Sequence, residues 1–147
     1  MKLSQMLKKS RMGFLFAAAL LSGCANLGPA YTPVTSVPQD KAIVYVYRSP
    51  SMMGAAISYD VHDGQSAVVT SLPNGGYYPY IRDPGEVEIW AKTESKSSVT
   101  LDLKPGDVKY VKGTLGVGFL VGRPNLTVVS NELGANEIKG CKLIPRN

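Results

Sequence analysis

Hydrophobic and polar positions alternate along much of this chain in short runs that are typical of β-strands. Residues 87–92 and 99–103 alternate with a period of two, which predicts strands that bury one face. Residues 42–48 (AIVYVYR) are apolar on both faces instead, which predicts a central strand covered on both sides. Further short strands are expected at residues 57–61, 67–70, 77–81, 108–115 and 126–130.

Turn signals rich in Gly, Pro, Asn and Asp separate these runs. They occur at residues 62–64, 72–76, 83–85 and 104–107. Such short strands, with a turn about every ten residues, predict an all-β fold, specifically a small β-sandwich of about seven to eight strands over residues 41–147. A short C-terminal helix is expected from Asn131, as its N-cap, to about Lys139, although Gly134 disfavours it.

The glycine-rich stretch at residues 115–122 (LGVGFLVG) fits the same period of two. Four apolar residues would share one face, opposite a face made largely of glycine; they are Leu115, Val117, Phe119 and Val121. We expect that face to pack in the core, with a docking edge for a partner or a mobile apolar hairpin as the alternatives. The stretch lacks the Gly-Lys-Ser/Thr ending of a phosphate loop, so it does not indicate nucleotide binding.

The first segment of the chain has the pattern of an export signal. A basic start is followed by an apolar run of about ten residues at 12–21, which is too short for a bilayer that needs roughly 20. The sequence Leu-Ser-Gly-Cys at residues 21–24 then resembles the lipobox of bacterial lipoproteins. This resemblance implies a signal peptide at residues 1–23, cleavage between Gly23 and Cys24, and acyl chains on the Cys24 thiol and on the new amine.

The residue after the cysteine bears on the destination. In Gram-negative lipoproteins, an Asp directly after the lipidated cysteine resembles the signal for retention in the inner membrane. This chain has Ala25 at that position instead. We therefore expect a lipid-anchored protein on the periplasmic face of the outer membrane. Two or three acyl chains hold a protein firmly, since each buried CH₂ contributes about 0.8 kcal/mol.

Residues 24–40 are predicted to form a tether that begins at the lipidated cysteine. Three prolines separated by small and polar residues favour an extended, largely unstructured segment with a reach of about 50 Å, at roughly 3.3 Å per residue. The alternative is a short edge strand laid on the domain.

The formal net charge of the whole chain differs from that of the mature protein. The 147 residues carry 16 Lys and Arg against 11 Asp and Glu, a formal charge of +5. Four of those basic residues, Lys2, Lys8, Lys9 and Arg11, belong to the signal peptide. Without it the charge falls to +1, which removes the main argument for nucleic-acid binding. We expect no nucleic-acid partner.

Candidate chemistry is sparse. His62 is the only histidine, and Asp60 would share its strand face, so a metal-dependent hydrolase is a remote alternative. No nucleophile motif surrounds Cys141 or the serines, and we therefore expect no catalytic residue, no cofactor and no metal site. Once Cys24 is acylated, Cys141 is a lone thiol, which we expect to be buried, with an intermolecular disulfide as the alternative.

Aromatic residues offer one candidate binding surface. Tyr77, Tyr78 and Tyr80 are close to Trp90 in sequence and would come together across a hairpin. Such a platform stacks on sugars, and peptidoglycan is the glycan of the bacterial envelope. Tyrosine is also an ordinary strand residue, so a purely structural role for these tyrosines is the alternative to glycan binding.

Three stretches carry a resemblance to a known family. KAIVYVYRSP at residue 41, NGGYYPYIRDPGEVEIWA at residue 74 and KPGDVKYVKG at residue 104 are similar to bacterial lipoproteins with a domain of unknown function. Their Pro-Gly turns that lead into alternating strands also look like PEGA-type small β-sandwich domains. The resemblance implies a cell-envelope setting and no established catalytic residues. We therefore expect a binding or structural module, with an envelope protein or peptidoglycan as its partner.

Overall fold

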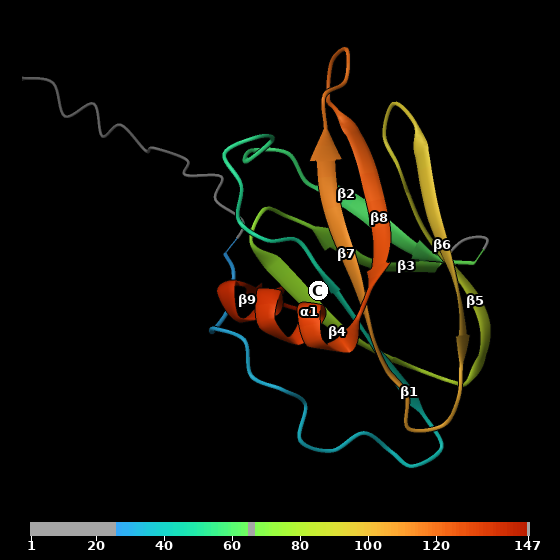
Figure 1. Cartoon of the computed structure of the whole chain (residues 1–147). Helices are drawn as coiled ribbons and strands as arrows, with labels where there is room; N and C mark the ends of the chain where they lie inside the picture. Colours follow the sequence, from blue (N-terminus) through green and yellow to red (C-terminus); the bar gives the residue numbers. More distant parts are fainter. Residues whose placement is uncertain (1–25, 65–66, 147) are drawn as a thin grey trace, which may run out of the picture.

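The computed structural model describes residues 26–64 and 67–146 (Figure 1). The signal peptide, its cleavage site at Gly23 and the lipidation site at Cys24 lie outside these residues. The elements along the described chain are β1 Ala42–Tyr47, β2 Tyr59–Asp63, β3 Ala67–Leu72, β4 Gly76–Arg82, β5 Gly85–Lys92, β6 Lys96–Leu103, β7 Val108–Gly116, β8 Arg123–Val129, α1 Asn131–Glu137, the 3-10 helix η1 Ile138–Gly140, and β9 Lys142–Leu143.

Two sheets, of five and four strands, make up most of the fold (Figure 1). The larger sheet has the order β8-β7-β1-β4-β9, in which β1 is antiparallel to β4 and parallel to β7. The smaller sheet has the order β3-β2-β5-β6 and is antiparallel throughout. The mostly-β fold with one short C-terminal helix confirms the expected class.

The main core lies between the two sheets. Alternate residues of β5 and β6 face it, as their period of two predicts: Val87, Ile89, Ala91, Leu101 and Leu103. From the larger sheet, Val44, Val46 and Val111 face the same core and are fully buried. Burial of such side chains contributes about 1.5–3 kcal/mol each, which makes this layer the main stabilising feature.

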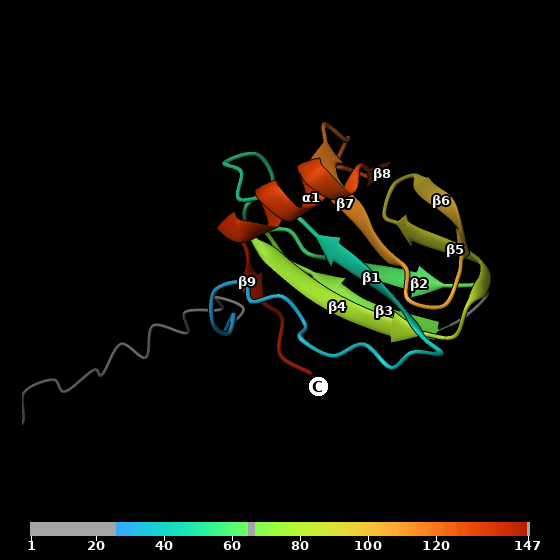
Figure 2. The same cartoon turned by 60° about the horizontal axis from the view of Figure 1, so that its bottom comes forward.

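A second core covers the outer face of the larger sheet. Ile43, Tyr45 and Tyr47 of β1 point into it, where α1, η1 and the N-terminal segment pack (Figure 2). Every residue of β1 is therefore buried, and the predicted strand with two covered faces is confirmed.

The N-terminal segment at residues 26–40 is largely extended, but it lies against the domain (Figure 2). Gly28 N donates to Leu143 O at 2.7 Å, and Tyr31 N donates to Cys141 O at 3.1 Å. The Tyr31 ring packs edge-on against Tyr45 and Tyr77. Residues 26–40 thus form neither a free segment nor the alternative edge strand: they lie on the domain, with a single bridge between Ala30 and Lys142.

Several details differ from the sequence predictions. The strand expected at residues 57–61 is β2, Tyr59–Asp63, which extends into the predicted turn, and β6 begins at Lys96 instead of residue 99. The described chain has nine strands, because the two-residue β9 pairs with β4 where no strand was expected. The cap of α1 is Ser130, not Asn131: the Ser130 hydroxyl accepts from Leu133 N at 3.2 Å, and Asn131 is the first helical residue. The expected last strand also starts earlier, at Arg123, because β8 pairs with β7 as far as its end at Gly116.

Candidate functional site

The four aromatic residues of the candidate glycan platform do not share a surface. Tyr77 is 3% exposed and belongs to the second core. Tyr80 packs against the main core, and its hydroxyl donates to Asp63 Oδ2 at 2.5 Å. Burial and this carboxylate raise the pKa of Tyr80 to about 12, so its phenol stays protonated at neutral pH.

Trp90 lies on the smaller sheet, stacked on His62 with ring centroids 4.0 Å apart. Its indole N–H donates to Gly64 O, and Lys96 Nζ lies 5.1 Å from the ring centroid. One face of the indole is therefore covered by imidazole. Tyr78 lines a groove of about 920 Å³, and Tyr77, Tyr80 and Trp90 are not among the residues that line this groove.

The Asp60 and His62 pair does not develop into a metal site. Within the described residues, no three His, Cys, Asp or Glu side chains gather as metal ligands would. The imidazole is instead half-buried against Trp90, and its Nδ1 is buried without a hydrogen-bond partner among the described residues. Aromatic stacking is the interaction that holds this ring.

A groove of about 920 Å³, which we call the edge groove, opens on the described part of the chain. It follows the outer edge of β3, which pairs with β2 on one side only and with no other described strand. Its lining residues are Asn26, Leu27, Ser58, Asp60, Val68, Val69, Thr70, Ser71, Pro73, Tyr78, Ile144, Pro145 and Arg146.

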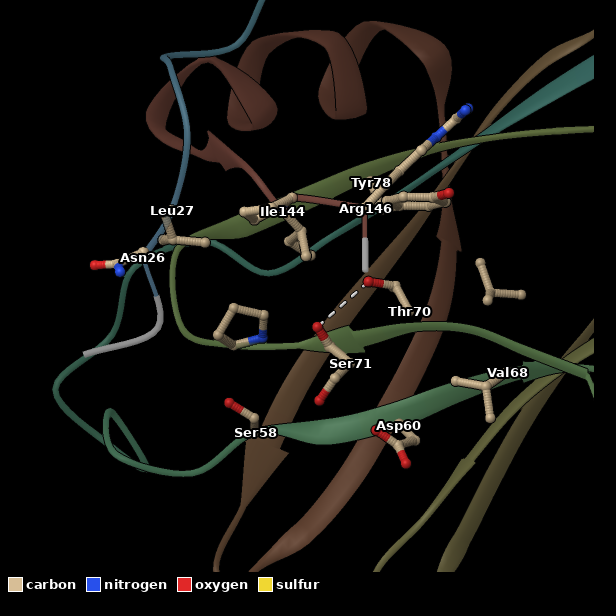
Figure 3. Close-up of a pocket in the computed structure, with 13 residues that line it drawn as sticks. Asn26, Leu27, Ser58, Asp60, Val68, Thr70, Ser71, Tyr78, Ile144 and Arg146 are labelled. Atoms are coloured by element: carbon tan, nitrogen blue, oxygen red, sulfur yellow. Dashed lines mark hydrogen bonds between the residues drawn. The ribbon is translucent and has the colours of Figure 1, made fainter. Parts of the chain in front are cut away.

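The lining shows how the edge groove is built (Figure 3). Four consecutive β3 residues, 68 to 71, contribute, so side chains from both faces of the strand border the hollow. Tyr78 and Ile144 lie on one side of β3 and Ser58 and Asp60 on the other. The hollow thus runs along the strand edge itself, where backbone donors and acceptors are available to an added strand.

The glycine-rich stretch does not pack in the core as expected. Of its four apolar residues predicted to share a buried face, only Leu115 is buried; residues 117–122 form a loop between β7 and β8, which we call the apolar loop. Its side chains are exposed, at 78% for Val117, 90% for Phe119, 83% for Leu120 and 46% for Val121. The prediction of a buried face is wrong because the facing β5–β6 hairpin turns back at residues 93–95 and offers no strand to cover them.

Glu94, in the β5–β6 turn, fixes the apolar loop. Its carboxylate accepts from the backbone N–H groups of Phe119, Leu120 and Val121, with distances of 2.6 Å to Phe119 N and to Val121 N. These three bonds lower the pKa of Glu94 to about 2. Thr93 Oγ1 donates to Gly122 O at 2.6 Å and holds the end of the loop. These hydrogen bonds therefore hold the backbone of the loop in one conformation, although its side chains are exposed.

Cys141 is buried, as expected, with 1% exposure. Its thiol contacts Arg48 O at 3.5 Å, and burial raises its pKa to about 11. Such a thiol is a poor nucleophile, since thiolate is the reactive form.

Sequence reasoning missed the edge groove and the role of Glu94. The groove combines residues 26–27 and 144–146 with residues 58, 60, 68–71, 73 and 78, so it depends on segments far apart in the sequence that pack together. One signal was present for Glu94: it is the sole acidic residue between the predicted strands at residues 87–92 and 99–103.

Among residues 26–64 and 67–146, no helix has the length and apolar character that a membrane crossing requires. Comparisons with protein-family models, with curated proteins and with solved structures find no match to this chain. The resemblance to envelope lipoproteins and to PEGA-type domains therefore stays a prediction.

Proposed function

We propose that this protein is a lipid-anchored lipoprotein of the outer membrane that faces the periplasm and acts as a non-enzymatic binding module. The basic start, the short apolar run and the lipobox cysteine support the anchor at Cys24. We assign the domain to the small β-sandwich class, of PEGA type, on its two sheets and Pro-Gly turns.

The observation that carries the binding role is the edge groove beside β3. A strand edge with one unpaired side supplies backbone hydrogen bonds to an extended polypeptide, and the adjacent hollow gives room for its side chains. Val68, 57% exposed, and Ile144 offer apolar contacts, whereas Asp60 and Arg146 offer charges of both signs. We therefore propose an extended segment of an envelope protein as the ligand.

Glycan binding is the second candidate, and Tyr78 favours it. This ring lines the edge groove together with Asn26, Ser58 and Ser71, which have the amide and hydroxyl groups that bind sugars. Trp90, on the smaller sheet, is not among the residues that line the edge groove.

One experiment in the producing cell tests the anchor and the groove together. A photo-crosslinking amino acid replaces Val68 at the groove or, as the matched control, the exposed Thr100 of β6. We expect position 68 to crosslink one envelope protein and position 100 to crosslink none. Equal products at the two positions would overturn the groove as the binding site.

The same cells, grown with labelled fatty acid, report on the anchor. Cys24→Ser should abolish the label, and a mutant that remains labelled contradicts lipidation at that residue. Sedimentation of the protein with purified peptidoglycan tests the second candidate. If the protein sediments, and this is lost in Tyr78→Ala but kept in Trp90→Ala, the ligand is a glycan and not a polypeptide.

A further inference from the structure

The apolar loop is an unusual surface for a protein in water. Val117, Phe119 and Leu120 are each more than three-quarters exposed, in a loop that projects beyond the rest of its sheet (Figure 1). Single exposed apolar residues are ordinary, but a contiguous group marks a site of interaction with a partner or a membrane.

The backbone of the loop is prepared for an apolar environment. Peptide N–H groups that enter lipid unpaired cost several kcal/mol each. In this loop the Glu94 carboxylate already binds the N–H groups of Phe119, Leu120 and Val121. The side chain of Glu94 is itself only 18% exposed and lies 4.0 Å from Arg123 Nε. The carboxylate thus lies against the backbone of residues 119–121 with its charge compensated by three N–H groups, and the exposed side chains of Val117, Phe119 and Leu120 are hydrocarbon.

A second apolar loop lies at the same end of the domain. Met52 is 97% exposed and Met53 is 57% exposed. Both belong to the connection between β1 and β2, which we call the methionine loop (Figure 1). The buried Arg48 side chain fixes this connection by donating to Gly54 O at 2.8 Å and Ile57 O at 2.6 Å. Gly54 packs against Leu115, the last buried residue before the apolar loop, so the two loops adjoin.

The start of the described chain lies on the side of the domain that carries the methionine loop. Gly28 is bonded to Leu143, and the neighbouring Lys142 N donates to Gly75 O at 2.9 Å. Asn74, next to Gly75, accepts from Ser51 N at the base of the methionine loop. Because Gly28 is fixed to the domain, the four residues from Cys24 to Gly28 span at most about 13 Å, at roughly 3.3 Å per residue.

We propose that the apolar loop inserts into the surface of the bilayer that holds the Cys24 acyl chains, with Met52 and Met53 beside it. This inference rests on the proposed lipid anchor. Phe119 and Leu120 would lie at the level of the upper acyl chains, and Arg123, with its side chain 61% exposed, would lie among the lipid phosphates. The domain would then lie on the membrane in one orientation, because the acyl chains and the apolar loop would both hold it.

Spin labelling of the lipidated protein tests this insertion. Cys24 is acylated under the proposal and Cys141 is buried, so a new surface cysteine is the site that reacts with a nitroxide. Phe119→Cys probes the loop, and Leu133→Cys on α1, 45% exposed, is the matched control. Both proteins are reconstituted into vesicles of phosphatidylethanolamine and phosphatidylglycerol.

The readout is the ratio of oxygen to nickel-chelate collision rates with the label. We expect this ratio to be several-fold higher at position 119 than at position 133, because oxygen concentrates in lipid and the chelate stays in water. Vesicle-bound protein with equal ratios at both positions overturns the insertion while the anchor stands. Protein that fails to bind vesicles overturns the anchor and the insertion together. A label at 119 that stays water-exposed on vesicles and is immobilised by envelope proteins overturns insertion in favour of a protein partner.

Discussion

A single contact explains why Gly134, a residue of low helix propensity, lies in the C-terminal helix. Gly134 is buried in α1, and a Cβ atom there would lie 2.3 Å from Tyr110 Cγ. Tyr110 in turn stacks on Tyr45 of the second core, with ring centroids 5.2 Å apart. The glycine is therefore the residue that lets the helix approach the sheet, and its low helix propensity is outweighed by packing.

We expect Gly134→Ala to destabilise the protein by about 1–3 kcal/mol, because overpacking outweighs the gain in helix propensity of about 1 kcal/mol. Urea unfolding followed by circular dichroism measures the change. Gly140→Ala is the control: a Cβ there meets no atom within 4 Å, and we expect a change within about 0.5 kcal/mol. Equal stabilities of the two variants would refute the packing role of Gly134.

At the scale of elements, the carboxylate of Glu94 connects the β5–β6 hairpin to the β7–β8 hairpin. Glu94 in the β5–β6 turn binds three backbone N–H groups of the apolar loop between β7 and β8. Its pKa is lowered from 4.5 to about 2, so the folded state favours the ionised form. The stabilisation from this group is thus fully present above about pH 4.5 and is lost as the pH falls towards 2.

Glu94→Gln should therefore weaken the pH dependence of the loop. In the parent protein we expect the amide resonances of Phe119, Leu120 and Val121 to shift together near pH 2, when the carboxylate is protonated. In the variant this transition should be absent, and hydrogen exchange in the loop should be faster at neutral pH. An unchanged amide titration in Glu94→Gln would mean that another group binds these donors.

For the whole molecule, the N-terminal segment sets how the domain sits relative to its proposed anchor. A free segment would give a reach of about 50 Å at roughly 3.3 Å per residue. The contacts of Gly28 and Tyr31 with the C-terminal segment leave only residues 24–27 before the first fixed point. If the protein is anchored at Cys24 as proposed, this short span would hold the domain close to the bilayer, as a membrane-contacting loop requires.

Tyr31→Ala should release this segment. The ring packs 5.1 Å from Tyr77 and 5.7 Å from Tyr45 between centroids, and its loss should destabilise the protein by about 2 kcal/mol. Hydrogen exchange should accelerate for the amides of Tyr31 and Val34, which are bonded to Cys141 O and Tyr45 Oη. Thr35→Ala, at an exposed position, is the control. Unchanged protection in Tyr31→Ala would show that backbone bonds alone hold the segment.

The sequence by itself determined the local features of this protein. Alternation in β5 and β6 and the doubly apolar β1 predicted both the strands and their buried faces, because side chains alternate strictly along a strand. The burial of Cys141 and the presence of a short helix also followed from the sequence. Each of these depends on residues close together in the chain.

Only the tertiary structure decided which apolar faces are covered. Residues 115–121 have the same alternation as a buried strand, yet Phe119 is exposed because the opposite hairpin ends at Glu94. Residues 26–37 have the composition of a linker, yet they pack because Tyr45 and Tyr77 leave room for Tyr31. The edge groove likewise depends on the packing of residues 26–27 and 144–146 beside β3. A period of two defines the two faces of a strand, but the presence of a partner layer depends on elements far away in the sequence.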